Sequence, residues 1–185
     1  MLKKKLTRCF INLELPSEAV AEIKNIQQEI KERFSLQGKF TELQNLHLTL
    51  KFLGEIDDET IKKVREQLKT IIIHQFNVKL GEVGVFSEKI VRIVWVKLAG
   101  AERLQQAVDQ TLVDLFPREE RFMGHITLAR VKSLSNEKLF FEHLKKTICN
   151  SVFTVNKFFL KQSILTHQGA VYKTLSAYSL QKKYF

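Results

Sequence analysis

Two short motifs, far apart in the chain, combine a histidine and a threonine at the same spacing. The first lies within residues 45–54 and the second within residues 124–130, and both read His-x-Thr-x with an apolar residue at each x. Chance predicts only about 0.06 such motifs in a chain of this composition. Alternate side chains of a β-strand share a face, so His47 lies beside Thr49 and His125 lies beside Thr127.

Paired imidazoles and hydroxyls are suited to acid–base chemistry on a phosphate. The ordinary pKa of histidine is about 6.5, so one neutral and one protonated ring can coexist near neutral pH. The neutral ring can accept a proton and the protonated ring can donate one, and each positioned transfer typically accelerates a reaction about 10²–10⁴-fold. The hydroxyls of Thr49 and Thr127 can donate hydrogen bonds to phosphate oxygens and stabilise charge that develops there. Either histidine could be the acid on this reasoning.

A metal site is the competing explanation for two histidines. Zinc sites usually add a third His, Asp, Glu or Cys at a recognisable spacing, and neither motif contains an acidic residue or a second histidine. The other histidines, His74, His143 and His167, fall at a helix end, on a helix and beside a turn, where exposed positions are expected. The sequence also lacks a glycine-rich phosphate loop. We therefore expect no metal, no cofactor and no ATP-driven reaction.

Length and composition indicate a folded, soluble protein. The 185 residues suffice for one ordinary domain or two small lobes with a shared core. No apolar run is long enough to span a membrane, and the start of the chain lacks the apolar core of a signal peptide, so we expect a cytoplasmic protein. We also expect a monomer. The net charge of +10 favours contact with polyanions, although lysine-rich solvated helices would give the same excess. Cys9 and Cys149 lack a metal or redox spacing and are expected to be free thiols.

The pattern of expected elements repeats once along the chain. Each half reads strand, helix, histidine strand, helix, strand, over residues 6–85 and 90–180. We predict an α+β fold in one bilobal domain, residues 1–185, whose lobes form a pseudo-two-fold duplicate. It has two antiparallel sheets, helices on the outside and a central cleft, and the C-terminal strands can cross between lobes. Such an arrangement would bring His47 and His125 to one site.

Local signals place some boundaries within each half. Ser17 can cap the first helix, and Asp57 or Asp58 can cap the second. The end of the chain, residues 163–180, predicts a closing hairpin turned at Gln168-Gly169.

The two motifs resemble those of the 2H phosphoesterase superfamily, and specifically of the RNA 2′,3′-cyclic phosphodiesterases, also called 2′-5′ RNA ligases. The similarity rests on His47-Leu-Thr-Leu-Lys-Phe-Leu-Gly and His125-Ile-Thr-Leu-Ala-Arg. One departure is Gly124, where the family commonly has proline; this loosens the backbone and removes no chemical group. Less specific matches extend the similarity to nearly the whole chain: Arg8-Cys-Phe-Ile, Arg92-Ile-Val-Trp, Ser163, Gly169 and Tyr172.

The resemblance implies metal-independent opening of RNA 2′,3′-cyclic phosphate ends to 2′-phosphates, with 2′-5′ ligation in the reverse direction. It makes His47 the proton donor and His125 the proton acceptor. The implied partner is RNA with cyclic-phosphate or 2′-phosphate ends, including tRNA fragments. The candidates for further substrate contacts are Arg130, Lys51, Arg8, Arg92, Phe52 and Tyr172.

Strand alternation separates two of these candidates. Lys51 shares the face of His47 and could meet a neighbouring phosphate, whereas Arg130 has the opposite parity to His125 unless the strand bends after Ala129. Arg8 and Arg92 hold equivalent places in the two halves and could serve the cleft or form structural pairs. The two aromatic candidates could stack on a base. For each of these candidates, a structural position in the core or on the surface explains the residue type equally well.

Two other functions fit the same residues. A binding module for RNA ends or tRNA would hold phosphate with salt-dependent affinity and form no product. An enzyme for small cyclic nucleotides or 2′-5′-linked oligonucleotides would keep the chemistry and change the substrate.

Overall fold

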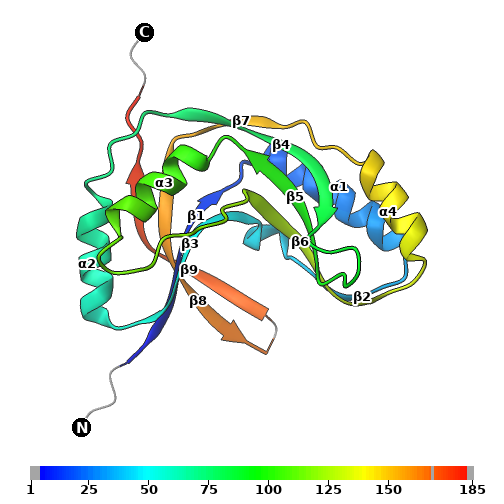
Figure 1. Ribbon diagram of the computed structural model, residues 1–185, viewed down its shortest axis with the longest axis horizontal. Helices are drawn as coiled ribbons and strands as arrows, with labels where there is room; N and C mark the ends of the chain where they lie inside the picture. The colour runs from blue at the N-terminus through cyan, green and yellow to red at the C-terminus, as the bar shows by residue number, and fades with distance from the viewer. Residues whose placement is uncertain (1–4, 168, 183–185) are drawn as a thin grey trace.

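Nine strands pair antiparallel in one curled sheet within residues 5–167 and 169–182, the part of the chain that the computed structural model describes (Figure 1). The strand order is β7-β4-β5-β6-β3-β1-β8-β9, and β2 pairs with β6 beside this path. The strands are β1 (Thr7–Glu14), β2 (Leu36–Phe40), β3 (His47–Ile56), β4 (Phe76–Val85), β5 (Ile93–Ala99), β6 (His125–Leu134), β7 (Val152–Val155), β8 (Lys157–Thr166) and β9 (Gly169–Ser179).

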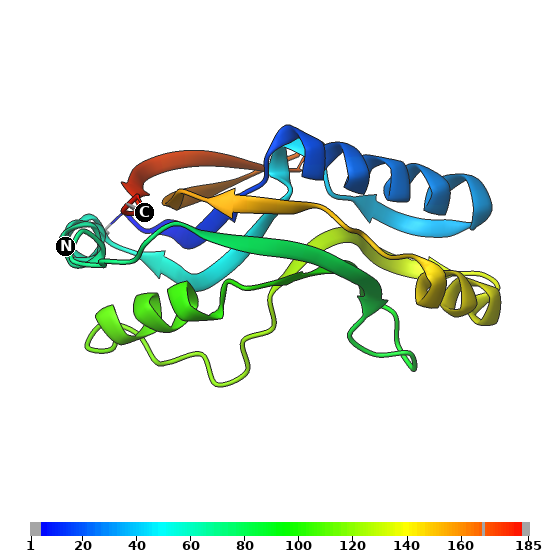
Figure 2. The same cartoon turned by 90° about the horizontal axis from the view of Figure 1, so that it is seen from above.

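The helices lie outside the sheet in two pairs. Both views place α1 and α4 at one end of the molecule and α2 and α3 at the other (Figures 1 and 2). The helices are α1 (Ser17–Arg33), α2 (Asp58–Leu68), α3 (Glu102–Thr111) and α4 (Glu137–Lys146), with a 3₁₀ turn η1 (Leu43–Asn45) before β3. No helix among the described residues is long and apolar enough to cross a membrane. The mixed α+β class, the antiparallel strands and the outer helices are thus as predicted.

One part of the predicted fold needs correction, because the two expected sheets are joined. The histidine strands β3 and β6 meet at the pair Leu48↔Ile126, which makes the sheet continuous. The strands also exchange between the predicted halves 6–85 and 90–180. Strand β4 pairs with β5 and β7, whereas β8 pairs with β1. The sequence order of the repeat is therefore not the spatial order of the strands.

Local physical chemistry accounts for several element boundaries. Asp57 caps α2, since its Oδ1 accepts a hydrogen bond of 2.9 Å from the Thr60 N–H. The cap position of α1 is Pro16, and Ser17 is the first helical residue, so the predicted serine cap is wrong. In the closing hairpin, β8 starts earlier than predicted and pairs with β9 from Lys157 onward. The predicted turn residue Gln168 lies outside the described residues.

The two histidine strands have the same conformation. Along the first nine residues of β3 and β6, buried and accessible positions follow in the same order. In both strands the register shifts directly after the threonine, so that Leu50 in β3 and Leu128 in β6 are extra residues relative to the neighbouring strand. An extra residue reverses the alternation of the side chains that follow it. The internal repeat is therefore a repeat of backbone geometry as well as of residue types.

Candidate active site

The pair Leu48↔Ile126 determines how the two motifs meet. Both side chains are buried, with exposed fractions of 0%. Because alternate residues of a strand face opposite ways, the flanking histidines and threonines face away from this core. All four line one cleft of about 840 Å³: His47, Thr49, His125 and Thr127. The prediction that both imidazoles face a single cleft is confirmed.

Both imidazoles are held in the same way, by a backbone carbonyl two residues before the histidine, just outside its strand. The Nδ1 of His47 lies 2.7 Å from the carbonyl oxygen of Asn45, and the Nδ1 of His125 lies 2.8 Å from that of Met123. A carbonyl oxygen only accepts hydrogen bonds, so Nδ1 carries the proton in each ring. The Nε2 atom is then the one available to accept or donate a proton, as a base or an acid requires. In His47 this atom also lies 3.1 Å from the Thr49 hydroxyl.

The surroundings of the two histidines differ. His47 contacts Phe10 and Tyr172, with ring centroids 5.1 and 5.2 Å away. Burial lowers the pKa of His47 below its usual range, and the positive charges of Lys161, His125 and Arg130 act in the same direction. His125 instead meets the edge or face of one ring, Phe86, at 5.0 Å. The first imidazole therefore lies in the more apolar environment.

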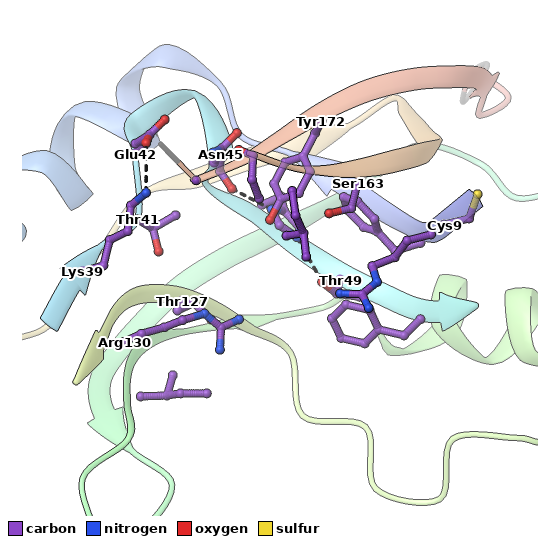
Figure 3. A pocket seen from close by; sticks show the side chains of 18 of the residues that line it. Cys9, Lys39, Thr41, Glu42, Asn45, Thr49, Thr127, Arg130, Ser163 and Tyr172 are labelled. Carbon is purple, nitrogen blue, oxygen red and sulfur yellow. Dashed lines mark hydrogen bonds and ion pairs between the residues drawn. The ribbon is translucent and has the colours of Figure 1, made fainter. Parts of the chain in front are cut away.

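The register shift in β6 brings Arg130 into the cleft. Leu128 and Ala129 are both buried, and the next side chain, Arg130, is exposed and lines the cleft with His125. Figure 3 shows Arg130 extending from β6 into the space between the two halves of the site. Its charge also opposes the rise in pKa that burial causes in Tyr172 on the other side. Arg130 reaches the cleft through the extra residue Leu128, which precedes Ala129, and not through the bend after Ala129 that the sequence prediction required.

The same shift in β3 removes Lys51 from the cleft, and the prediction that it contacts substrate is wrong. Its side chain is 5% exposed and forms an ion pair with Asp109 of α3. Its Nζ also donates a 2.7 Å hydrogen bond to the carbonyl oxygen of Pro117. The extra residue Leu50 turns Lys51 to the core side, and Phe52, 74% exposed, takes the cleft position instead.

The two remaining arginine candidates, Arg8 and Arg92, differ in their position relative to the cleft. Arg8 lines the cleft and pairs at 3.2 Å with Glu55. Arg92 is exposed and is not among the cleft-lining residues, although its neighbour Ile93 is. It precedes β5, and its carbonyl accepts a 2.8 Å hydrogen bond from the Val131 N–H. Equivalent places in the sequence pattern did not give equivalent places in space.

Several cleft residues had not been predicted from the sequence. Lys39 and Glu42 form an ion pair of 3.4 Å at one side of the cleft (Figure 3). Asn45 donates a 2.8 Å hydrogen bond to the carbonyl of Ala170 and so attaches the segment before His47 to β9. Lys39 was missed because it lies in β2, and residues 36–40 have no alternating pattern that would predict a strand. Within the described residues, no group of three or more His, Cys, Asp or Glu side chains is placed to hold a metal ion.

The architecture and the paired motifs define a phosphoesterase, and comparisons with known proteins agree. A sequence model of the LigT like Phosphoesterase family matches residues 13–95. The crystal structure of Escherichia coli LigT in its apo form superposes with a TM-score of 0.78 at 23% identity, over 96% of this chain and 99% of that one, which shows the same fold.

The family follows from closer relatives. An RNA 2′,3′-cyclic phosphodiesterase of Archaeoglobus fulgidus is 33% identical over 92% of this chain and 99% of its own length. One from Methanocaldococcus jannaschii is 29% identical over 91% of this chain and 98% of its own. The chain belongs to the RNA 2′,3′-cyclic phosphodiesterase family of the 2H phosphoesterases.

Proposed function

We propose that this protein opens RNA 2′,3′-cyclic phosphate ends to 2′-phosphates without a metal ion. The observation that carries the proposal is the pairing of Leu48 with Ile126, which places both His-x-Thr motifs on one cleft. Relatives named RNA 2′,3′-cyclic phosphodiesterase match nearly the whole chain and support this substrate. RNA is therefore the proposed partner.

The proposed reaction divides two proton transfers between the two motifs. A water oxygen forms a bond to phosphorus while the bond from phosphorus to the ribose O3′ breaks. The Nε2 of His125 accepts the proton of the water, and the Nε2–H of His47 donates a proton to O3′. Thr49, Thr127 and Arg130 bind the non-bridging oxygens, where negative charge develops. A ribose 5′-hydroxyl in place of water would give a 2′-5′ linkage by the same transfers.

The environment of His47 bears on its role as the acid. In the ligand-free cleft, burial favours the neutral ring. A bound phosphodiester carries a negative charge, and an opposite charge within about 4–6 Å favours the protonated ring. Substrate binding would then raise the pKa of His47, so that the ring takes up from solvent the proton that it donates to O3′.

Turnover in the presence of EDTA tests the proposal. An oligonucleotide that ends in a 2′,3′-cyclic phosphate should be converted to the 2′-phosphate, with many turnovers per protein. The variants His47→Ala and His125→Ala should each lose this activity while retaining the fold by circular dichroism. An absence of ring opening, or activity that survives either substitution, would overturn the proposal.

The same assay separates the other functions. A binding module would retain the oligonucleotide in a salt-dependent way and release no product. An enzyme for small cyclic nucleotides would open a mononucleotide 2′,3′-cyclic phosphate as fast as an oligonucleotide end. The net charge of +10 favours the longer polyanion.

A further inference from the structure

Helix α1 carries a buried amide that bonds at once to strand β6 and to the segment that follows β2. Gln27 is 3% exposed, and its Nε2 donates hydrogen bonds of 2.9 Å to the carbonyl oxygens of Thr41 and Leu128. An amide NH₂ has two hydrogens, so both bonds can form together. Buried glutamine without partners is costly, whereas here both donors are used. The side chain is therefore a fixed link between three segments.

The two carbonyls belong to two backbone segments that set the geometry of the site, one near each motif. Leu128 is the extra residue of β6, directly after Thr127 and two positions before Arg130. Its carbonyl also accepts a 2.9 Å hydrogen bond from the Thr41 N–H. The Gln27 amide thus completes the bonding of the backbone that turns Arg130 toward the cleft.

Thr41 connects the Gln27 amide to the segment before the first motif. It lines the cleft, follows β2 and precedes η1, whose last residue is Asn45. The carbonyl of Asn45 accepts the hydrogen bond from the Nδ1 of His47. A single amide outside the cleft therefore joins the segment that enters the first motif to the register shift of the second.

Strand β3 has a corresponding attachment, which is to α3. Gln27 is the eleventh residue of α1 and Asp109 is the eighth residue of α3, and both side chains are buried. Asp109 accepts hydrogen bonds from Lys51, the residue after the extra Leu50, and from the Glu119 N–H in the segment before His125. Each histidine strand is thus attached near its register shift to a buried polar side chain of a helix, Gln27 for β6 and Asp109 for β3.

We propose that Gln27 is a positioning residue for the reaction, which holds Thr127, Arg130 and the segment before His47 in one arrangement across the cleft. This inference rests on the proposed function. Misplacement of catalytic groups by about 1 Å can cost on the order of 100-fold in rate. We expect the loss in kcat, because alignment matters most in the transition state, with a smaller change in KM.

The test compares two substitutions in α1. Gln27→Leu removes both hydrogen bonds at similar volume. Ile30→Val changes the core packing of the same helix and leaves the hydrogen bonds to Thr41 and Leu128 in place. Both should lower the Tm. Measured well below the Tm, Gln27→Leu should reduce kcat at least about tenfold, and Ile30→Val should leave it unchanged. If Gln27→Leu does not fold, Gln27→Asn, whose amide is withdrawn by one methylene, should give a smaller loss of kcat.

A second readout does not depend on turnover. In NMR spectra of the imidazole nitrogens, Gln27→Leu should shift the ring signals of both His47 and His125, and Ile30→Val should shift neither. Unchanged kcat and unchanged ring signals in Gln27→Leu would overturn the inference while the wild-type activity stands. If the wild-type protein shows no turnover, the proposed function fails, and the ring signals alone decide this inference.

Discussion

The two halves of the site share a backbone and differ in the side chains built on it. Each has a His-x-Thr motif and a register shift directly after the threonine. The third residue after the threonine faces the cleft in both. That residue is Phe52 in the first half and Arg130 in the second. The attachment to the helix is an ion pair, Lys51 with Asp109, in the first half and a neutral amide in the second. The repeat therefore preserves where groups point, while one half offers an aromatic surface and the other a charge.

The largest expected effect concerns the feature that the two halves share. His47→Ala and His125→Ala should each lower kcat by about 10²–10⁴-fold, because each removes one positioned proton transfer. Multiple-turnover assays on the cyclic-phosphate oligonucleotide measure this. A loss confined to one variant would show that only one half takes part in proton transfer.

The two attachments should differ in their contribution to stability. Asp109→Ala leaves the ammonium of Lys51 buried without its carboxylate, and we expect a loss of about 3–5 kcal/mol in the free energy of unfolding. The double variant Lys51→Met/Asp109→Leu should recover much of it, because no buried charge remains. Urea denaturation measures both, and a loss below about 1 kcal/mol in Asp109→Ala would contradict a structurally important ion pair.

Acid should weaken the same attachment. Burial alone would raise the pKa of Asp109, but hydrogen bonds from Lys51, the Glu119 N–H and Gln105 hold it below its usual range. The stability it contributes is therefore present above the unfolded pKa of about 3.9 and is lost as the pH falls through the lower folded value. The Asp109→Ala variant should lack this part of the acid dependence.

The two cleft-facing residues should affect binding differently. Arg130→Ala should weaken binding of RNA ends and reduce the slope of log Kd against log salt concentration by about 1. Phe52→Ala should cost about 1–3 kcal/mol if a base stacks on the ring, with little change in that slope. Titrations at three salt concentrations distinguish them, and equal slopes for both variants would contradict the division into charge and aromatic surface.

The smallest expected effect is the difference in environment at His47. Its NMR titration midpoint should lie below about 6.5, and Tyr172→Ala should raise the midpoint by admitting water. Because the unfolded chain binds more protons between the two pKa values, the stability contributed by neutral His47 decreases as the pH falls below about 6.5. A midpoint above 6.5 without ligand would contradict the apolar setting.

The sequence predicted the motifs and the general fold because their signals are local. His-x-Thr with apolar neighbours requires only strand alternation, and the repeat of elements follows from periodicity. The meeting of His47 and His125 could be anticipated from the repeat alone. The exchange of β4 and β8 between the halves could not, because strand pairing depends on contacts far apart in the chain.

The positions of Lys51 and Arg92 could not be predicted for a different reason. Simple alternation through residues 47–51 would place Lys51 beside His47, but the extra Leu50 reverses it. Register shifts have no reliable signal in a single sequence, and the charge of Lys51 suggested substrate where the fold provides Asp109. Arg92 lies directly before β5, and its carbonyl bonds to the Val131 N–H of β6 while its side chain is exposed and outside the cleft lining.

A double-variant comparison tests the central claim, that two motifs act on one phosphate. The rates of cyclic-phosphate opening would be measured in EDTA for wild type, His47→Ala, His125→Ala and the double variant. Groups that act as a unit give strongly non-additive losses, so the double variant should be about as slow as the slower single variant. If its loss equals the product of the two single losses, the histidines act independently and the account of one shared site is wrong.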